Sequence, residues 1–87
     1  DEAIRHYNAA LAVNPNQLDA HYNLGNVYRK LGRLPDAVAS YQNALAIQPS
    51  NPRVMLNLGL ALSDLGDMAG ATELYRRAVH RDPGFSE

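Results

Sequence analysis

The chain has 87 residues, with eight lysine and arginine residues against nine aspartate and glutamate residues, and a formal net charge of -1. This balance gives no electrostatic reason to expect nucleic acid as a partner, and we predict none. The chain has no cysteine, which excludes disulfides, thiolate metal sites and cysteine nucleophiles and leaves the compartment open. No apolar run approaches the roughly 20 residues that a membrane-spanning helix needs, so we predict no membrane insertion.

Apolar residues recur at steps of three and four in five segments, 1–13, 18–31, 35–48, 52–65 and 69–81. This spacing is typical of amphipathic helices. Nowhere do apolar and polar residues alternate over a length that would indicate a strand. The sequence therefore predicts an all-α fold of about five antiparallel helices joined by short turns.

The residues at the helix starts support these boundaries. We predict that Asn16 caps the helix 18–31 and that Asp19 completes a capping box with it. Asn51 is placed to cap the helix 52–65, and Asp67 is suited to begin the last helix.

Glycines have two predicted roles. Gly32 and Gly66 follow the last apolar residue of their helices, where a left-handed residue ends a helix at little cost. Gly25 and Gly59 lie inside helices, where glycine costs about 1 kcal/mol relative to alanine. We interpret them as points where another helix approaches closely, and we expect the counterparts to be the alanines of the following helices, Ala37 and Ala71. The large side chains that fill the space beside these small residues would be Tyr28, Tyr41 and Tyr75.

Much of the chain repeats with one period. Three prolines, Pro15, Pro49 and Pro83, stand 34 residues apart, and the triplet Asn23-Leu24-Gly25 returns as Asn57-Leu58-Gly59. The same period relates three further sets, which are Ala3, Ala37 and Ala71, then Tyr7, Tyr41 and Tyr75, then Ala10, Ala44 and Ala78. Such self-similarity is typical of stacked repeats, in which each unit buries its apolar face against a neighbour.

These residues resemble the motif of the tetratricopeptide repeat family. In the first full unit the motif is carried by Leu24-Gly25-Asn26-Val27-Tyr28, Ala37, Tyr41, Ala44 and Pro49. In the second it is carried by Leu58-Gly59, Ala71, Tyr75, Ala78 and Pro83. The chain departs from the pattern where the family often has tryptophan or tyrosine, at His21, Met55 and Leu62.

The resemblance implies an α-solenoid, a right-handed superhelix of antiparallel helix pairs. The whole chain, 1–87, would form a single array, in which 1–17 is the second helix of a truncated repeat, 18–51 and 52–85 are full repeats, and 86–87 is a stub. In this family the first helices line a concave groove, which implies a scaffold that binds a protein or peptide ligand. The array is also similar to those of O-linked N-acetylglucosamine transferases.

We expect the groove face to be the side of 18–31 opposite Leu24 and Tyr28, together with the matching side of 52–65. The candidate partner-binding residues are Tyr22, Asn23, Asn26, Arg29, Lys30, Arg53, Leu56, Asn57, Leu60 and Asp64. Amide side chains offer both a donor and an acceptor, which matches an extended peptide backbone. The alternative is that the asparagines bond to neighbouring backbone groups or face only water.

Two of these asparagines, Asn26 and Asn57, also resemble part of the carboxylate clamp with which some family members hold a chain-terminal carboxylate. The clamp's lysine is replaced here by Tyr22, and its last basic pair would lie in a repeat that this chain lacks. We therefore expect no complete clamp.

No catalytic, cofactor or metal site is predicted. The three histidines, His6, His21 and His80, lie on three different helices without ligand spacing, and no glycine-rich phosphate loop or nucleophile motif is present. The segment is therefore not predicted to be an enzyme by itself. It could be the substrate-recruiting arm of a larger enzyme such as a glycosyltransferase.

A third alternative is a self-assembling structural repeat. Terminal repeats usually need a polar outer cap, and no capping helix follows the last unit. We expect an apolar side of the last helix, including Leu74 and Val79, to be open. Two explanations are open: either more repeats flank this segment in a longer protein, or the uncapped terminal helices allow a homo-oligomer.

Overall fold

The computed structural model describes residues 2–81 and contains five α-helices. They are α1 (Glu2–Val13), α2 (Leu18–Lys30), α3 (Leu34–Ile47), α4 (Pro52–Leu65) and α5 (Met68–Arg81). Within this range there is no strand, and the predicted all-α solenoid is confirmed. The third proline of the repeat, Pro83, and the predicted stub 86–87 lie outside the described residues.

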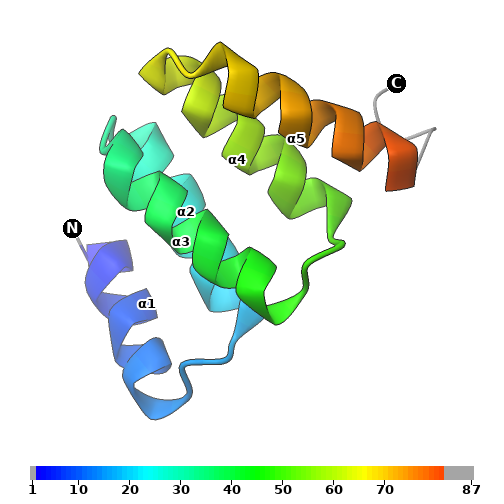
Figure 1. Cartoon of the computed structure of the whole chain (residues 1–87). Helices are drawn as coiled ribbons and strands as arrows, with labels where there is room; N and C mark the ends of the chain where they lie inside the picture. Colours follow the sequence, from blue (N-terminus) through cyan, green and yellow to red (C-terminus); the bar gives the residue numbers. More distant parts are fainter. Residues whose placement is uncertain (1, 82–87) are drawn as a thin grey trace.

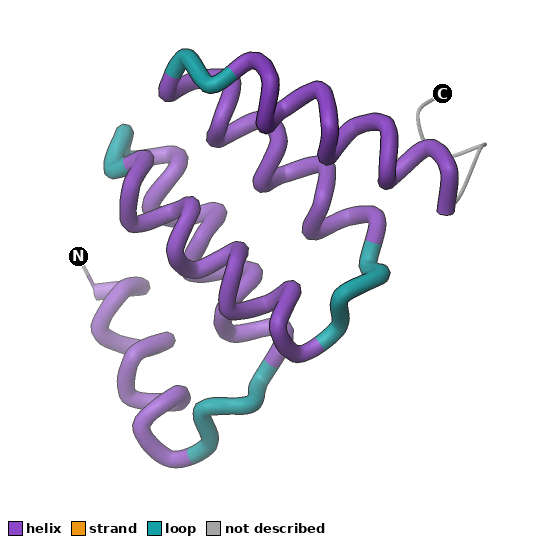
Figure 2. The backbone as a smooth tube through the Cα atoms, viewed as in Figure 1, coloured by secondary structure: helices purple, strands orange, loops and turns teal. Residues whose placement is uncertain are grey.

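The helices form a stack in which each one packs on its predecessor in the chain (Figures 1 and 2). The most extensive contacts lie within the pairs α2–α3 and α4–α5, which correspond to the two predicted full repeats. One contact skips a helix, because α2 also touches α4. The first helices of the two repeats therefore lie side by side, and their facing residues share one surface.

Two of the three predicted helix caps are present. The Oδ1 atom of Asn51 accepts hydrogen bonds from the backbone N–H groups of Arg53 at 3.0 Å and Val54 at 3.2 Å. Asp67 Oδ1 accepts one from the N–H of Gly70 at 3.0 Å. Each bond satisfies a backbone donor that has no partner inside its helix.

The predicted cap at Asn16 is wrong. Gln17 occupies the N-cap position of α2, and its side chain makes no capping bond there. Its Nε2 atom instead donates to the carbonyl oxygens of Ala10 at 2.8 Å and Asn14 at 3.1 Å. The amide is used to close the end of α1, so the capping box with Asp19 does not form.

The turns at Gly32 and Gly66 are as predicted. Their φ angles are +80° and +92°, in the left-handed region that favours glycine. After each glycine the next N–H donates back across the helix end, from Arg33 to Tyr28 O and from Asp67 to Leu62 O, both at 2.8 Å. This is the Schellman arrangement, which satisfies the last carbonyls of a helix.

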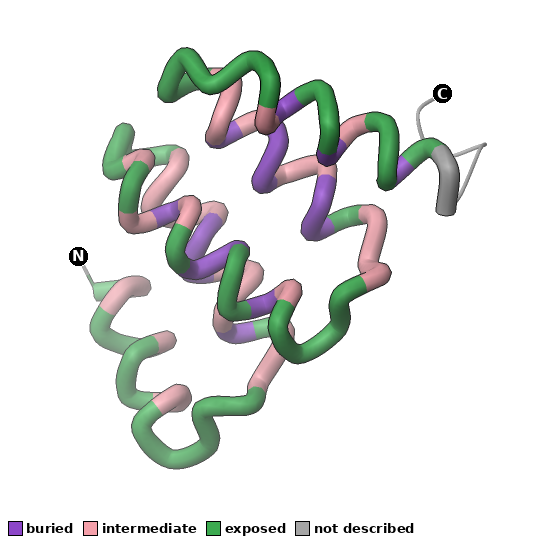
Figure 3. The backbone as a smooth tube through the Cα atoms, in the orientation of Figure 1, coloured by how far each residue is buried: buried purple, intermediate pink, exposed green. Residues whose placement is uncertain are grey.

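The main core cluster is formed by α3, α4 and α5, and α1 contributes no buried residue to it (Figure 3). It contains Ala37, Tyr41, Ala44, Val54, Met55, Leu58, Ala61, Leu74 and Ala78. The prediction that Leu74 lies on an open face is wrong, because this side chain is 7% exposed and belongs to the core cluster. Val79 is exposed, as predicted.

Gly25 and Gly59 mark close approaches between helices, as predicted, and the atoms nearest to each glycine belong to the predicted tyrosines and not to the alanines. A Cβ atom on Gly25 would lie 2.6 Å from Cε1 of Tyr41, and one on Gly59 would lie 2.7 Å from Cε1 of Tyr75. The tyrosine one turn after each alanine places its ring against the glycine. The glycine leaves room for an aromatic ring, not for a neighbouring backbone.

We predict that Gly25→Ala destabilises the fold by about 1–3 kcal/mol through overpacking. This loss should exceed the gain of about 1 kcal/mol that alanine brings to a helix interior. Chemical denaturation of Gly25→Ala and of the unsubstituted protein measures the difference. In the double variant with Tyr41→Leu the two effects should not add, because removing the ring removes the clash. A more stable Gly25→Ala variant would contradict the close contact.

Candidate functional site

Helices α2 and α4 carry the ten predicted groove residues, and seven of these residues line two cavities. The larger, the Arg29 cavity, has a volume of about 450 Å³ and is lined by Asn26, Arg29, Lys30, Asn57 and Asp64. The smaller, the Tyr22 cavity, has about 210 Å³ and is lined by Leu18, Asp19, Tyr22, Asn51, Arg53 and Val54. The other three predicted residues are half-buried and line neither cavity; they are Asn23, Leu56 and Leu60.

Side chains of three helices meet in a polar network made of Tyr22, Asn26, Tyr41 and Asn57. Asn57 Nδ2 donates to Tyr22 Oη at 2.6 Å and, more weakly, to Asn26 Oδ1 at 3.4 Å. The Tyr41 hydroxyl donates to the same Asn26 Oδ1 atom. Partly buried bonds of this kind are stronger than exposed ones. The network therefore ties α2, α3 and α4 together.

The network divides each asparagine into an occupied half and a free half. Asn57 uses its Nδ2 group internally, and Asn26 uses its Oδ1 atom. Among residues 2–81, Asn57 Oδ1 and Asn26 Nδ2 have no hydrogen-bond partner, and neither has the side chain of Asn23. One acceptor and one donor of the network thus stay available, and the two network asparagines bond to side chains and not to the backbone.

Tyr41 is the member of the network whose hydrogen bond was not predicted from the sequence. Its position predicted only a core aromatic, and its side chain is fully buried. A buried tyrosine hydroxyl usually finds a partner, which is the one available signal. Burial raises the pKa of Tyr41 to about 12, while nearby Arg29 lowers it and Tyr22 raises it. The hydroxyl therefore keeps its proton at neutral pH and serves as the donor to Asn26.

The Arg29 cavity holds two cationic side chains and one carboxylate. Arg29 Nε lies 3.4 Å from Asp64 Oδ2, with side chains 34% and 50% exposed. A pair this open to solvent is screened and contributes little stability. Lys30 is exposed and makes no ion pair within the part of the chain that the structure describes. The cavity thus carries an excess of one positive charge.

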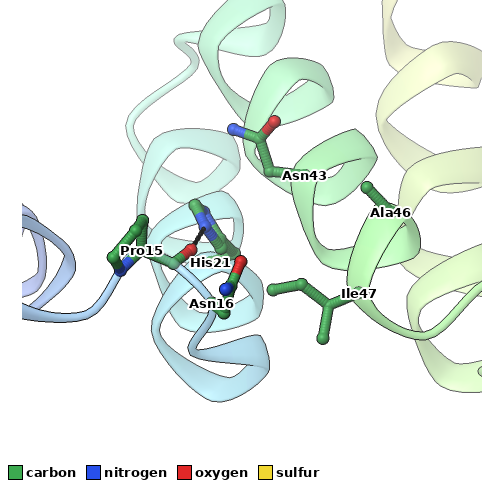
Figure 4. Close-up of a pocket in the computed structure, with 6 residues that line it drawn as sticks. All are labelled: Pro15, Asn16, His21, Asn43, Ala46 and Ile47. Atoms are coloured by element: carbon green, nitrogen blue, oxygen red, sulfur yellow. Dashed lines mark hydrogen bonds between the residues drawn. The ribbon is translucent and has the colours of Figure 1, made fainter.

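Another cavity, the His21 cavity, has a volume of about 550 Å³ (Figure 4). It is formed by the turn before α2 and the end of α3, and its lining residues are Pro15, Asn16, His21, Asn43, Ala46 and Ile47. His21 Nε2 donates to the Pro15 carbonyl at 2.9 Å, while its Nδ1 atom is buried without a partner. None of the predicted groove residues lines this cavity.

Residues 2–81 contain no group of three or more histidine, cysteine, aspartate or glutamate side chains that could hold a metal ion. None of the helices in this range has the length and apolar character needed to cross a membrane.

Comparison with known proteins agrees with the repeat motif. The family model described as "TPR repeat" matches residues 1–32 and 25–66, and the one described as "Tetratricopeptide repeat" matches 53–81. Repeats of this family are a non-catalytic scaffold for protein interactions. No protein of curated function matches the chain significantly in sequence.

Solved structures of a protein named MamA are similar in fold. "Crystal structure of MamA" is 28% identical over 99% of this chain with a TM-score of 0.89, and "Crystal structure of MamA protein" is 29% identical over 92% with a TM-score of 0.86. A further MamA structure, 22% identical with a TM-score of 0.88 over 93% of this chain, shows likeness of fold alone. The chain spans 52%, 44% and 44% of these proteins, about half their length.

We predict that Asn57→Ala lowers the free energy of unfolding by about 1–2 kcal/mol, because Tyr22 and Asn26 lose their shared donor. Urea denaturation of Asn57→Ala, Tyr22→Phe and the double variant forms a cycle. The two effects should fall short of additivity by about 0.5–1.5 kcal/mol. Asn23→Ala is the matched control, because the same residue type lies one period earlier outside the network, and it should stay within about 0.5 kcal/mol of the parent. Full additivity would show that the bond between Asn57 and Tyr22 contributes nothing to stability.

Tyr41 should make stability depend on alkaline pH. Its pKa of about 12 in the folded chain exceeds the value of about 10 for an unperturbed tyrosine. The folded state therefore holds this proton more tightly, and the contribution is complete below about pH 10 and is lost as the pH rises towards 12. Urea denaturation at a series of alkaline pH values should show a steeper loss of stability for the parent than for Tyr41→Phe. Parallel profiles would contradict the shift.

Proposed function

Because the chain belongs to the tetratricopeptide repeat family, we propose that its α2–α4 groove binds an extended segment of a partner protein. The observation that carries this proposal is the row of two cavities where the first helices of consecutive repeats adjoin. Seven of the ten candidate residues line these cavities, and amide groups without internal partners lie among them.

An extended peptide presents alternating N–H and C=O groups, and the groove has both kinds of partner. Asn57 Oδ1 can accept from a peptide N–H, Asn26 Nδ2 can donate to a peptide carbonyl, and Asn23 can do either. Such bonds recognise backbone and not sequence. Sequence preference would come from half-buried apolar side chains beside them, Tyr22, Leu56 and Leu60, which offer area for an anchoring side chain.

The polar network supports this role by fixing the groove before a ligand arrives. Asn26 and Asn57 are each held through one half of the amide, so the other half is oriented in the unbound protein. Binding to side chains that are already ordered costs less conformational entropy than binding to free rotors.

A second candidate function, self-association, is favoured by the outer face of α5. A cavity of about 470 Å³ is lined there by Thr72, Tyr75, Arg76 and Val79. One period earlier, Tyr41 is buried and Val38 and Leu45 pack against the core that α4 completes. The α5 face is therefore suited to another helix, which a second copy could supply. A mass that rises with concentration in light scattering would indicate this role.

The other hypothesis, that this array is the substrate-recruiting arm of a larger enzyme, is about the longer protein of which the array would be a part. It uses the same groove, so it concerns what is attached to the array and not how the array binds.

We predict that Asn23→Arg weakens peptide binding by roughly tenfold or more, because a bulky side chain then occupies the groove face. The probe is a library of short random synthetic peptides, and affinities of the selected peptides are measured by fluorescence polarisation. Ala39→Arg, at an exposed position of α3, is the matched control and should bind as the parent does. Both variants should melt within a few degrees of the parent, since Ala39 is exposed and half-buried Asn23 makes no hydrogen bond through its side chain among residues 2–81. Equal binding by Asn23→Arg would place the peptides elsewhere, for example at the His21 cavity.

A further inference from the structure

The positive charge of the Arg29 cavity is not part of the repeating pattern. One period after Arg29 and Lys30 the chain has Ser63 and Asp64, and α4 folds with no basic residue in its last turn. Basic residues near a helix end also stabilise the helix macrodipole, but α3 and α4 both end without one. Packing of the repeat therefore does not require this pair, and the cavity it lines is a local feature of α2.

Three donor groups converge on this cavity without a full set of internal acceptors. Lys30 makes no ion pair among residues 2–81. Arg29 bonds to Asp64 through Nε alone, which leaves its two terminal nitrogens without a bond inside the described chain. Asn26 points its oxygen into the polar network, so its Nδ2 group is the free half. All three residues line the same space of about 450 Å³.

We propose that the Arg29 cavity receives an aspartate or glutamate side chain of the partner segment, whose carboxylate accepts hydrogen bonds from Arg29, Lys30 and Asn26. This inference rests on the proposed groove function and specifies the partner's chemistry. A carboxylate has two coplanar oxygens, which match the planar donor edge of a guanidinium. The ammonium of Lys30 supplies a further charge without demanding geometry.

Asp64 sets the strength of this site. It is the one carboxylate that lines the cavity, and its 3.4 Å pair with Arg29 is half exposed. A partner carboxylate competes with it for the guanidinium. Loss of the Asp64 charge should therefore strengthen acid binding, whereas loss of the Lys30 charge should weaken it.

The inference is separate from capture of a chain terminus. The donors lie on a helix that the segment crosses, so an internal acidic residue suffices. Peptides with an acetylated amino end and an amidated carboxyl end contain no terminal carboxylate, and they separate the two sources of the charge.

The experiment selects binders from a library of such capped random peptides. The selected peptides should share an aspartate or glutamate at one position, and replacing it by the matching amide should weaken binding to the parent roughly threefold to tenfold. Lys30→Gln should remove most of that difference. Asp64→Asn should tighten binding of the acidic peptide about twofold to fivefold.

The matched control is Arg77→Gln, which makes the same change of charge at an exposed position of α5 outside both groove cavities. It should leave the preference for the acidic peptide unchanged. The preference should also shrink as salt rises, because screening at about 0.15 M ionic strength already acts over roughly 8 Å.

Selected peptides without a shared acidic position, or an equal loss from the amide peptide on Lys30→Gln and on the parent, would overturn the acidic pocket and leave the groove standing. Peptides whose binding is unaffected by Asn23→Arg, or a library that yields no binder, would overturn the groove and the acidic pocket together.

Discussion

The contact between the Tyr41 ring and Gly25 sets how closely α3 packs against α2. The ring fits against α2 only because residue 25 has no Cβ atom, which would lie 2.6 Å from the ring. The hydroxyl at the end of the same ring then reaches Asn26, the next residue along α2. One side chain therefore fixes how α3 lies on α2 and also orients an amide of the groove. The packing of the pair and the chemistry of its surface are set together.

Comparison with the second repeat shows which of these contacts the packing of a helix pair requires. Tyr75 lies on Gly59 as Tyr41 lies on Gly25, but the position that matches Asn26 is Leu60. The Tyr75 hydroxyl has no hydrogen-bond partner within residues 2–81. The ring and the glycine recur because every helix pair must pack, whereas the amide does not recur. Asn26 is therefore present in one repeat and absent from the next. This is expected of a residue whose role lies at the surface and not in the packing of the helices.

The sequence predicts the fold well because the signals that define it are local or periodic. Helix spacing, the Asn51 cap and the glycine turns each depend on a few neighbouring residues, and the period of the repeat gives the stacking. The wrong cap prediction at Asn16 shows the limit of such local signals. The Gln17 amide can bond to backbone groups at the end of α1 or at the start of α2, and the path of the turn decides between them. The wrong prediction for Leu74 shows a second limit. Helical spacing predicts which face of a helix is apolar, but it does not predict which neighbouring helix covers that face.

The site was harder to predict than the fold, since hydrogen bonds between side chains of different helices leave no periodic trace. Asn26 and Asn57 stand on adjacent helices, yet which half of each amide is free depends on Tyr22 and Tyr41. A row of identical asparagines, each offering both groups, would bind a peptide in either direction. Two amides held in opposite senses by one network offer a donor on α2 and an acceptor on α4. With a cationic cavity beside that donor, the proposed groove would distinguish the two directions of a bound chain, a polarity that the repeat motif alone does not encode.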